Sequence, residues 1–186
     1  MRGSDPRMAR ILLVLAVFAV YLPLMAGGFV WDDHLLVVQN RLTGSFSNIP
    51  EMFMTDLWAG TPVPDAEPGY YRPLMLVDLA LSRSLFDLNH RLHHLHNLFW
   101  HGLAILLLLI LLERLLHDRL AATIGAAVFA LHPVQIEVVG FISARNDPMA
   151  VSWLLLSLLL LSDKEPSNRK LVLGGVASTA AMLCKE

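Results

Sequence analysis

The fold of this chain is decided by the apolar run ILLVLAVFAVYLPLMA, residues 11–26, and by GGFVWDDH, residues 27–34, which follows it. The apolar run is uncharged and long enough to enter a bilayer, whereas an Asp at the centre of a membrane helix costs about 2.5 to 3.5 kcal/mol. We therefore place Asp32 and Asp33 at the water interface just beyond a membrane helix. Two acids beside Trp31 at a membrane surface form a candidate functional site.

The composition of the whole chain also indicates an integral membrane protein. Hydrophobic residues make up 55% and charged residues 16% of the sequence, and the mean hydropathy is +0.56. Soluble domains average about 45–50% apolar and 25% charged residues. The net charge of -2 is too small to indicate a nucleic-acid partner, and the single cysteine, Cys184, leaves the redox compartment open. The sequence thus predicts an all-α membrane protein that binds no nucleic acid.

Further apolar segments predict about five membrane helices in total, with basic residues in the turns between them. The expected division is a cytoplasmic tail (1–8), membrane helix 1 (9–28), an external loop (29–92), membrane helix 2 (93–116), membrane helix 3 with an external His-Pro segment (120–147), membrane helix 4 (148–162), a cytoplasmic loop (163–170) and a truncated membrane helix 5 (171–186). Basic residues lie in the tail, after helix 2 and after helix 4, which makes that side cytoplasmic by the positive-inside rule. The acids then face the periplasm or lumen.

The external loop contains two weakly amphipathic stretches, 49–58 and 72–88. We expect both to be short helices lying in the membrane interface. Between them, residues 60–69 hold several prolines and glycines, which exclude regular structure and predict an exposed loop.

The acidic pair, Asp32 and Asp33, has two interpretations. The simpler one is the solvated start of a loop beside an interfacial Trp. The sharper one is a general base or a cation site, because paired carboxylates at an apolar surface suit both roles. The pair alone does not separate these interpretations.

A second group of polar residues lies in the expected membrane helix 2. The spacing of His94, Asn97 and His101 places them on one helical face, with His90 one turn earlier. This favours a polar stripe packed against neighbouring helices. A zinc site is the weaker interpretation, because further ligands at a fixed spacing are missing.

A third group lies between Pro133 and Pro148. Glu137 and Arg145 are eight residues apart, which predicts an ion pair on one helical face. Alternatively, Arg145 binds an anionic headgroup through its planar fork. Near the chain's end, Lys185 is expected at headgroup depth, where a lone Lys is usually an anchor.

Taken in order, these motifs resemble the N-terminal part of the TMTC-type protein O-mannosyltransferases and their bacterial relatives. The motifs are FVWDDH (29–34), YYRPL (70–74), His94-x-x-Asn97-x-x-x-His101, ALHPVQIEVV (130–139) and CKE (184–186). The resemblance implies a polytopic GT-C-like helical bundle in a bacterial inner membrane or an ER membrane. It also implies that this chain is an N-terminal fragment, because the family continues with more membrane spans and tetratricopeptide repeats.

The resemblance further implies transfer of a sugar from a polyprenyl-phosphate carrier to a hydroxyl acceptor, on a protein or a glycan, at the non-cytoplasmic face. Asp32 is then the expected base, and Asp33 positions the acceptor or a cation. The expected ligands of the donor phosphate are Lys185, Arg145 and Arg72, and the expected supporting residues are His94, Asn97, His101, His132 and Glu137. No metal is assigned, and a divalent cation as cofactor is left open.

The alternative is a polytopic membrane protein that is not an enzyme, such as a transporter or an assembly subunit. A transporter needs ionisable residues near the middle of its helices. Here they gather at helix ends on one side, which favours surface chemistry on a lipid-linked substrate.

Overall fold

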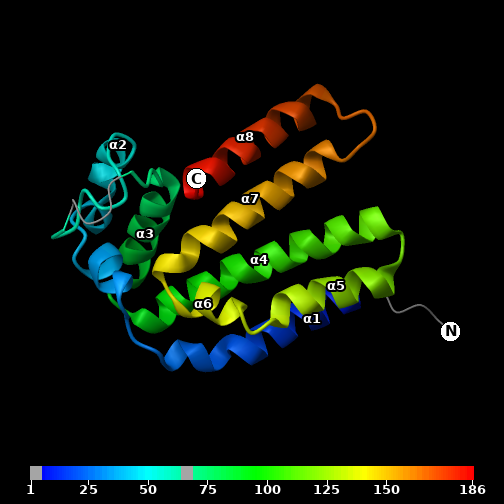
Figure 1. The fold of residues 1–186 in the computed structure, drawn as a ribbon, viewed down its shortest axis with the longest axis horizontal. Coiled ribbons are helices and arrows are strands. Elements are labelled where there is room, and N and C mark those ends of the chain that lie inside the picture. Colours follow the sequence, from blue (N-terminus) through cyan, green and yellow to red (C-terminus); the bar gives the residue numbers. More distant parts are fainter. Residues whose placement is uncertain (1–5, 64–68) are drawn as a thin grey trace.

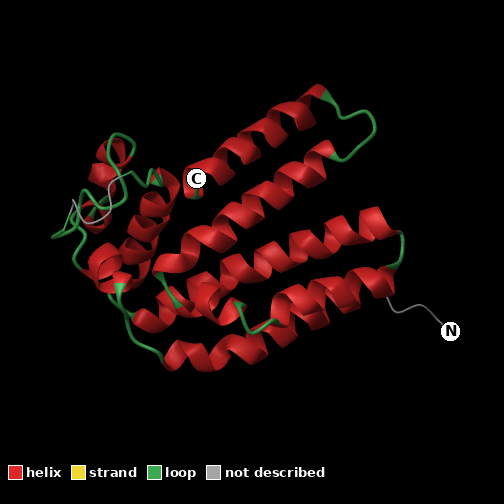
Figure 2. Ribbon diagram, viewed as in Figure 1, coloured by secondary structure: helices red, strands yellow, loops and turns green. Residues whose placement is uncertain are grey.

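The computed structural model describes residues 6–63 and 69–186. Within these ranges every regular element is a helix (Figure 2), so the predicted all-α fold is confirmed. The α-helices are α1 (Pro6–Tyr21), α2 (Ile49–Met52), α3 (Pro73–Phe86), α4 (His90–Leu116), α5 (Arg119–Leu131), α6 (Gln135–Gly140), α7 (Asn146–Leu161) and α8 (Asn168–Cys184). Short 3-10 helices cover Leu22–Ala26, Leu42–Gly44, Phe46–Asn48 and Ser143–Arg145, and a π-helix covers His34–Val38. The first part of the expected tail, 1–5, and the proline-rich residues 64–68 lie outside the described residues.

Helix α4 is the centre of the bundle (Figure 1). It packs against α1, α5 and α7, and α7 packs in turn against α8. In the described part of the chain, α4 alone is long and apolar enough to cross a membrane, judged by length and composition. Arg10–Ala26 and α5 are shorter apolar helices.

Local sequence sets the ends of these helices. Pro23 lacks a backbone N–H and restricts the residue before it, and α1 accordingly ends at Tyr21 and passes into a 3-10 turn. His117 ends α4 with a left-handed φ of 56°. Asp118 then caps α5, because its side chain accepts two backbone N–H groups of the first turn. This tight turn makes α4 and α5 neighbours.

The first apolar cluster lies between α1, α4 and α5. Ala122, Ala126 and Ala130 are spaced four residues apart and fully buried, so α5 presents a smooth face that lets its neighbours approach closely. Opposite this face lie the side chains of Leu13, Val17, Tyr21, Leu98, Ile105 and Leu109.

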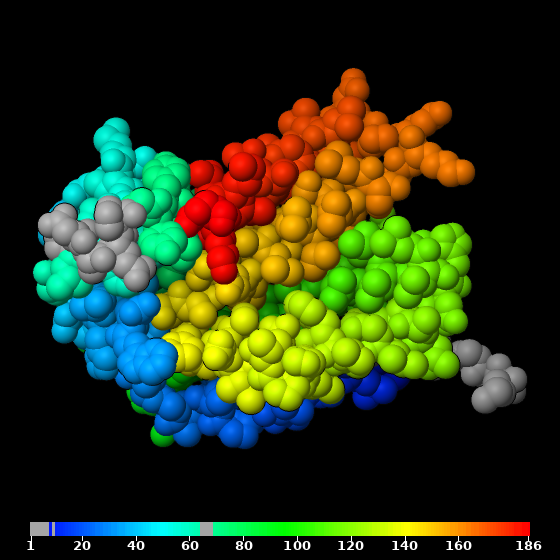
Figure 3. All heavy atoms as spheres, in the orientation of Figure 1, coloured from blue at the N-terminus to red at the C-terminus, as the bar shows by residue number. Residues whose placement is uncertain are grey.

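The second apolar cluster lies beneath residues 29–63, which we call the cap. Its members are Leu36, Val37, Leu42, Met52, Leu57, Trp58, Met75, Leu76, Leu79, Ala80 and Ile142. The cap packs on α3 at one end of the bundle, and α3 also contacts α8. Figure 3 shows α3 beside the C-terminal residues of α8.

The external segment differs from the sequence-based expectation in two ways. The helix expected over 49–58 ends at Met52, because the chain turns there to bury Leu57 and Trp58 with Met52. Gly60, expected in an exposed loop, is buried, and its carbonyl accepts the N–H of Arg41 at 2.8 Å. An amphipathic pattern does not distinguish a membrane surface from a protein surface, and here the protein itself covers the apolar face.

The basic turns lie together at the end opposite the cap. Figure 1 shows the start of α1, the α4–α5 turn and the α7–α8 turn at this end. Between the two ends the helices expose large apolar side chains, including Leu15, Leu120, Val128 and Val172, each more than half exposed. Soluble monomers rarely expose apolar surface on this scale.

Replacing Gly60 by Ala is expected to destabilise the cap. A Cβ at this position would lie 2.1 Å from Asn40 Oδ1 and 2.6 Å from Leu42 Cγ. Asn40 does not move aside freely, because its Oδ1 accepts the N–H of Leu42 at 2.8 Å. We expect a loss of about 1–3 kcal/mol, seen as a lower thermal unfolding temperature. Gly44→Ala is the matched control, since a Cβ there meets nothing within 4 Å; equal unfolding temperatures would contradict the prediction.

Candidate functional site

The acidic pair follows a strained turn. Trp31 has a φ of 46°, a conformation that non-glycine residues rarely adopt and that clusters at functional sites. Its indole is 79% exposed and lies 5.3 Å, between ring centroids, from Phe141. The π-helix His34–Val38 follows directly, and π-helical turns are also frequent at functional sites. The backbone on both sides of the acids is therefore unusual.

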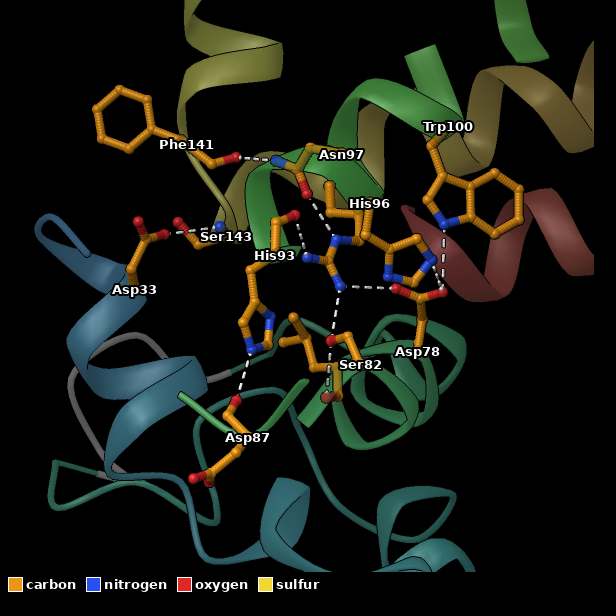
Figure 4. A network of polar contacts seen from close by, with 12 residues as sticks. Asp33, Asp78, Ser82, Asp87, His93, His96, Asn97, Trp100, Phe141 and Ser143 are labelled. Carbon is orange, nitrogen blue, oxygen red and sulfur yellow. Dashed lines mark hydrogen bonds and ion pairs between the residues drawn. The ribbon is translucent and has the colours of Figure 1, made fainter. Parts of the chain in front are cut away.

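The two acids have different environments. Asp33 is 0% exposed, and its Oδ1 accepts the N–H of Ser143 at 2.7 Å (Figure 4). Its Oδ2 accepts the N–H of Val30 at 3.1 Å. Asp32 is exposed and makes no hydrogen bond or ion pair with the described residues. The carboxylate of Asp33 is thus fastened by two backbone hydrogen bonds, whereas the carboxylate of Asp32 has no partner among the described residues.

Asp33 is fastened to residues 141–145, the segment between α6 and α7. Asn97 of α4 holds the same segment, because its Nδ2 donates to the carbonyl of Phe141. The Oδ1 of Asn97 accepts the Nε–H of Arg145 at 2.6 Å. The 141–145 segment is therefore tied both to the acidic pair and to the central helix.

Arg145 is fully buried, with 0% of its side chain exposed. Its Nη1 donates to Asp78 Oδ2 at 3.0 Å and to Ser82 Oγ at 2.8 Å, and its Nη2 donates to the carbonyl of His93 at 3.0 Å. Figure 4 shows these groups converging from α3 and α4. A buried charge is tolerated when it is paired and its hydrogen bonds are satisfied. We call these residues, with Asn97, the Arg145 network.

The predicted ion pair between Glu137 and Arg145 is wrong. That prediction requires a continuous helix from Pro133 to Pro148, but the helix ends and Phe141 is extended, with φ -91° and ψ 124°. The two side chains therefore do not share a face; Glu137 is exposed and Arg145 is buried. Arg145 as a phosphate ligand stays a prediction that this geometry does not favour, since no part of its side chain is accessible.

The other two candidate phosphate ligands lie closer to the surface. Lys185 Nζ forms an ion pair with Asp147. Arg72 contacts Glu186 through Nη2, at 2.9 Å from Oε1, and through Nε, at 3.3 Å from Oε2, and it lies 4.6 Å from the ring centroid of Tyr70. Burial raises the pKa of Glu186, but the hydrogen bond and charge of Arg72, a backbone hydrogen bond and the charge of Lys185 together outweigh burial, so the net pKa is lowered. Both cations keep part of their surface accessible to an anion.

A cavity of about 320 Å³ lies beside Lys185. Its lining residues come from α4, α5, α6 and α7 as well as the chain's end: His101, Ala104, Phe129, Gln135, Val138, Asp147, Pro148, Ala150, Val151 and Lys185. The wall is mainly apolar, with the Asp147–Lys185 pair as its charged part. Such a cavity fits a ligand that has an anionic head and an apolar body. Helix α6 joins this cavity to the 141–145 segment.

The predicted polar stripe on α4 is present and packed. His94, Asn97 and His101 are all buried. The Nε2 of His101 lies 3.3 Å from the carbonyl oxygen of Ala130, and neither ring nitrogen of His94 has a partner in the described residues. His132 is exposed instead, and its Nδ1 accepts the N–H of Val134. Across residues 6–63 and 69–186, no group of three or more His, Cys, Asp or Glu side chains is arranged to hold a metal ion.

Asp78, Ser82 and Ser143 are absent from the site predicted from sequence. Asp78 does carry a detectable signal, because it stands alone in the apolar run Leu74–Leu81. A carboxylate in a buried helix needs a cationic partner. Ser143 acts through its backbone N–H, which no side-chain pattern reveals.

Sequence comparisons agree with the motifs. Protein O-mannosyl-transferase Tmtc1 of Drosophila melanogaster is 30% identical over 173 residues, covering 91% of this chain and 20% of that protein. Protein O-mannosyl-transferase TMTC3 of Mus musculus is 28% identical over 181 residues, covering 94% and 20%. The chain is a relative of the TMTC-type protein O-mannosyl-transferases. The resemblance drawn from the motifs is thereby confirmed.

A third relative is Protein O-mannosyl-transferase F38B6.6 of Caenorhabditis elegans, which is 26% identical over 182 residues, covering 96% of this chain and 26% of that protein. The chain thus spans only 20% to 26% of the length of these TMTC-type relatives. No family model matches the chain, and no solved structure matches it.

Replacing Asp33 by Asn is expected to destabilise the protein more than replacing Asp32 by Asn. Both oxygens of Asp33 accept backbone N–H groups, so an Asn would turn its NH2 group toward one of these donors. Leaving a buried donor unmatched costs about 1–3 kcal/mol. Asn at position 32 meets no such conflict. Thermal unfolding of the two variants measures the difference, and equal unfolding temperatures would mean that the Asp33 contacts contribute nothing to stability.

Replacing Arg145 by Gln should cost roughly 3–5 kcal/mol, because the buried Asp78 loses its arginine partner and, among the described residues, keeps only its contacts with Trp100 and His96. Adding Asp78→Asn to this variant should recover part of the loss. Arg41→Gln is the matched control, since it breaks an exposed ion pair with Glu51 and should change little. Thermal unfolding is the measurement. If the Arg145 and Arg41 variants unfold at the same temperature, the Arg145 network has no structural role.

Proposed function

We propose that the protein is a membrane glycosyltransferase that moves a sugar from a polyprenyl-phosphate carrier to a hydroxyl group of a protein. The relatives are named as protein O-mannosyl-transferases, which supports the transferase class and mannose as the sugar. The observation that carries the proposal is the asymmetry of the acidic pair. Asp32 is free to take a proton, while its neighbour Asp33 is buried and fastened to the 141–145 segment.

The reaction assigns separate tasks to the two acids. The acceptor oxygen forms a bond to C1 of the sugar, and the bond between C1 and the phosphate oxygen breaks. The carrier phosphate leaves with the electron pair of that bond, and the hydroxyl proton passes to Asp32, the general base. Asp33 is a positioning residue, because its contacts fix the backbone on which Asp32 stands.

The donor phosphate is proposed to lie near Lys185 and Arg72, with its apolar chain along the cavity. Support comes from the cavity of about 320 Å³, whose mainly apolar wall includes Lys185. Charge-assisted hydrogen bonds from Lys and Arg are the usual means of holding phosphate. We assign Arg145 to holding the 141–145 segment, because its guanidinium is buried against Asp78.

The protein is further proposed to be a polytopic GT-C-like bundle, with α1, α4, α5, α7 and α8 in the membrane and the cap on the periplasmic or lumenal face. The exposed apolar side chains of these helices support this placement, and so do the basic turns opposite the cap. Helices α5, α7 and α8 have 13, 16 and 17 residues, fewer than the roughly 20 that span a bilayer. Their flanking turns would complete the span.

Ion transport is less well supported than transfer chemistry. The buried histidines of α4 lie between His90 and His101, in the half of the helix nearer the cap. A proton or ion path needs ionisable groups through the middle of the bundle. Around the middle of α4, Leu103–Leu112 carries no charge.

Replacing Asp32 by Asn in the full protein should lower transfer from polyprenyl-phosphate mannose by about 10²- to 10⁴-fold. Asn keeps the size of the side chain but does not accept the proton, so donor binding and thermal unfolding should stay unchanged. Transfer to an acceptor peptide is the measurement. Glu165→Gln, an exposed acid in the α7–α8 turn at the opposite end, is the control and should retain full activity.

Near-normal turnover of the Asp32 variant would end the assignment of this residue as the base. A rate loss accompanied by an equal loss of donor binding would also count against it, since a base acts after the donor is bound.

A further inference from the structure

A second cavity lies at the end of the bundle opposite the cap. Its volume is about 450 Å³. The lining residues come from α1, from the last turns of α4 and from the start of α5: Arg10, Ile110, Glu113, Arg114, His117 and Arg119. Three of these six residues are arginines and one is a carboxylate, and none of them takes part in the site at the other end.

The charges of this cavity are incompletely matched within the described residues. Arg10 forms an ion pair with Glu113, yet its Nε is buried without a hydrogen-bond partner. Arg114 donates to a backbone carbonyl and a Ser hydroxyl, and its closest carboxylate, Asp163, is 3.7 Å away. Arg119 is exposed and makes no side-chain hydrogen bond or ion pair with residues 6–63 or 69–186. The cavity therefore has donors and positive charge to offer an anion.

Apolar side chains surround this positive cavity. Each basic lining residue is next in sequence to, or one turn from, a large exposed apolar residue: Ile11, Leu115, Leu116 and Leu120. Leu120, which adjoins Arg119, is 69% exposed. A positively charged cavity with an apolar border is the arrangement expected at the boundary between lipid headgroups and acyl chains.

We propose that this cavity binds the headgroup of an anionic phospholipid, with the acyl chains lying on the apolar border. The inference rests on the proposed membrane placement, in which this end faces the cytoplasmic leaflet. Guanidinium groups recognise phosphate through their planar fork. Basic pockets between membrane helices on the cytoplasmic side bind anionic headgroups. Free phosphate would use the same charges, but it would gain nothing from the apolar border.

The test measures lipid bound to the purified full protein by native mass spectrometry. Detergent-solubilised protein is titrated with phosphatidylglycerol and, separately, with phosphatidylcholine of the same acyl chains. We expect phosphatidylglycerol to be retained in preference. Arg119→Gln should weaken this binding about fivefold, as removal of one charge near an anionic lipid predicts. Arg119 suits the test because it is exposed and its removal breaks no contact in the described structure.

Arg169→Gln is the matched control. Arg169 is an exposed basic residue at the start of α8, outside the cavity lining, and its variant should bind phosphatidylglycerol normally. An equal loss in both variants would indicate diffuse surface charge and overturn the proposal. Equal retention of the two lipids would overturn it as well.

A further arm adds inorganic phosphate at millimolar concentration. Phosphatidylglycerol should stay bound; its complete displacement would assign the cavity to free phosphate and overturn the lipid proposal. Sugar transfer is not the readout here. A protein that binds phosphatidylglycerol selectively but transfers no sugar would therefore overturn the proposed function alone.

Discussion

The buried charge of Arg145 is the constraint on which the rest of the structure depends. A guanidinium without solvent must obtain every contact from the protein, and here α3 supplies Asp78 and Ser82 while α4 supplies Asn97 and a carbonyl. These contacts fix where the chain passes between α6 and α7. Two residues earlier, the N–H of Ser143 holds Asp33. The position of the acidic pair is thus set by a buried ion pair.

In this arrangement, the residues that hold the backbone rigid differ from the residue that is left available for chemistry. Polar groups that have hydrogen-bond partners, such as the guanidinium of Arg145, hold the backbone in one geometry. Asp32, one residue from a fastened neighbour and one from a strained Trp31, is left with an unmatched carboxylate. The base proposed at Asp32 would need little reorganisation, because residues that do not touch the acceptor hold its backbone in place.

Composition and local spacing predicted the helical fold and the packed stripe of His94, Asn97 and His101, because both depend on periods of a few residues. Neither composition nor local spacing predicts contacts between residues that are distant in the sequence. Asp78 and Arg145 are 67 positions apart, and the difference between Asp32 and Asp33 arises from a backbone N–H 110 positions away. The burial of Gly60 was not predicted for a related reason. Turn residues indicate that the chain bends, but they do not indicate which other residues pack over the bend.

The cations proposed to hold the donor phosphate, Lys185 and Arg72, each contact a carboxylate of the same chain. An arriving phosphate therefore competes with an internal carboxylate for each of these cations. The affinity for the donor phosphate then reflects the difference between the cation–phosphate contact and the cation–carboxylate contact that it replaces. We therefore expect this affinity to be moderate. The same carboxylates compete for the cations when the spent carrier must depart, so a site of this kind favours release of its product.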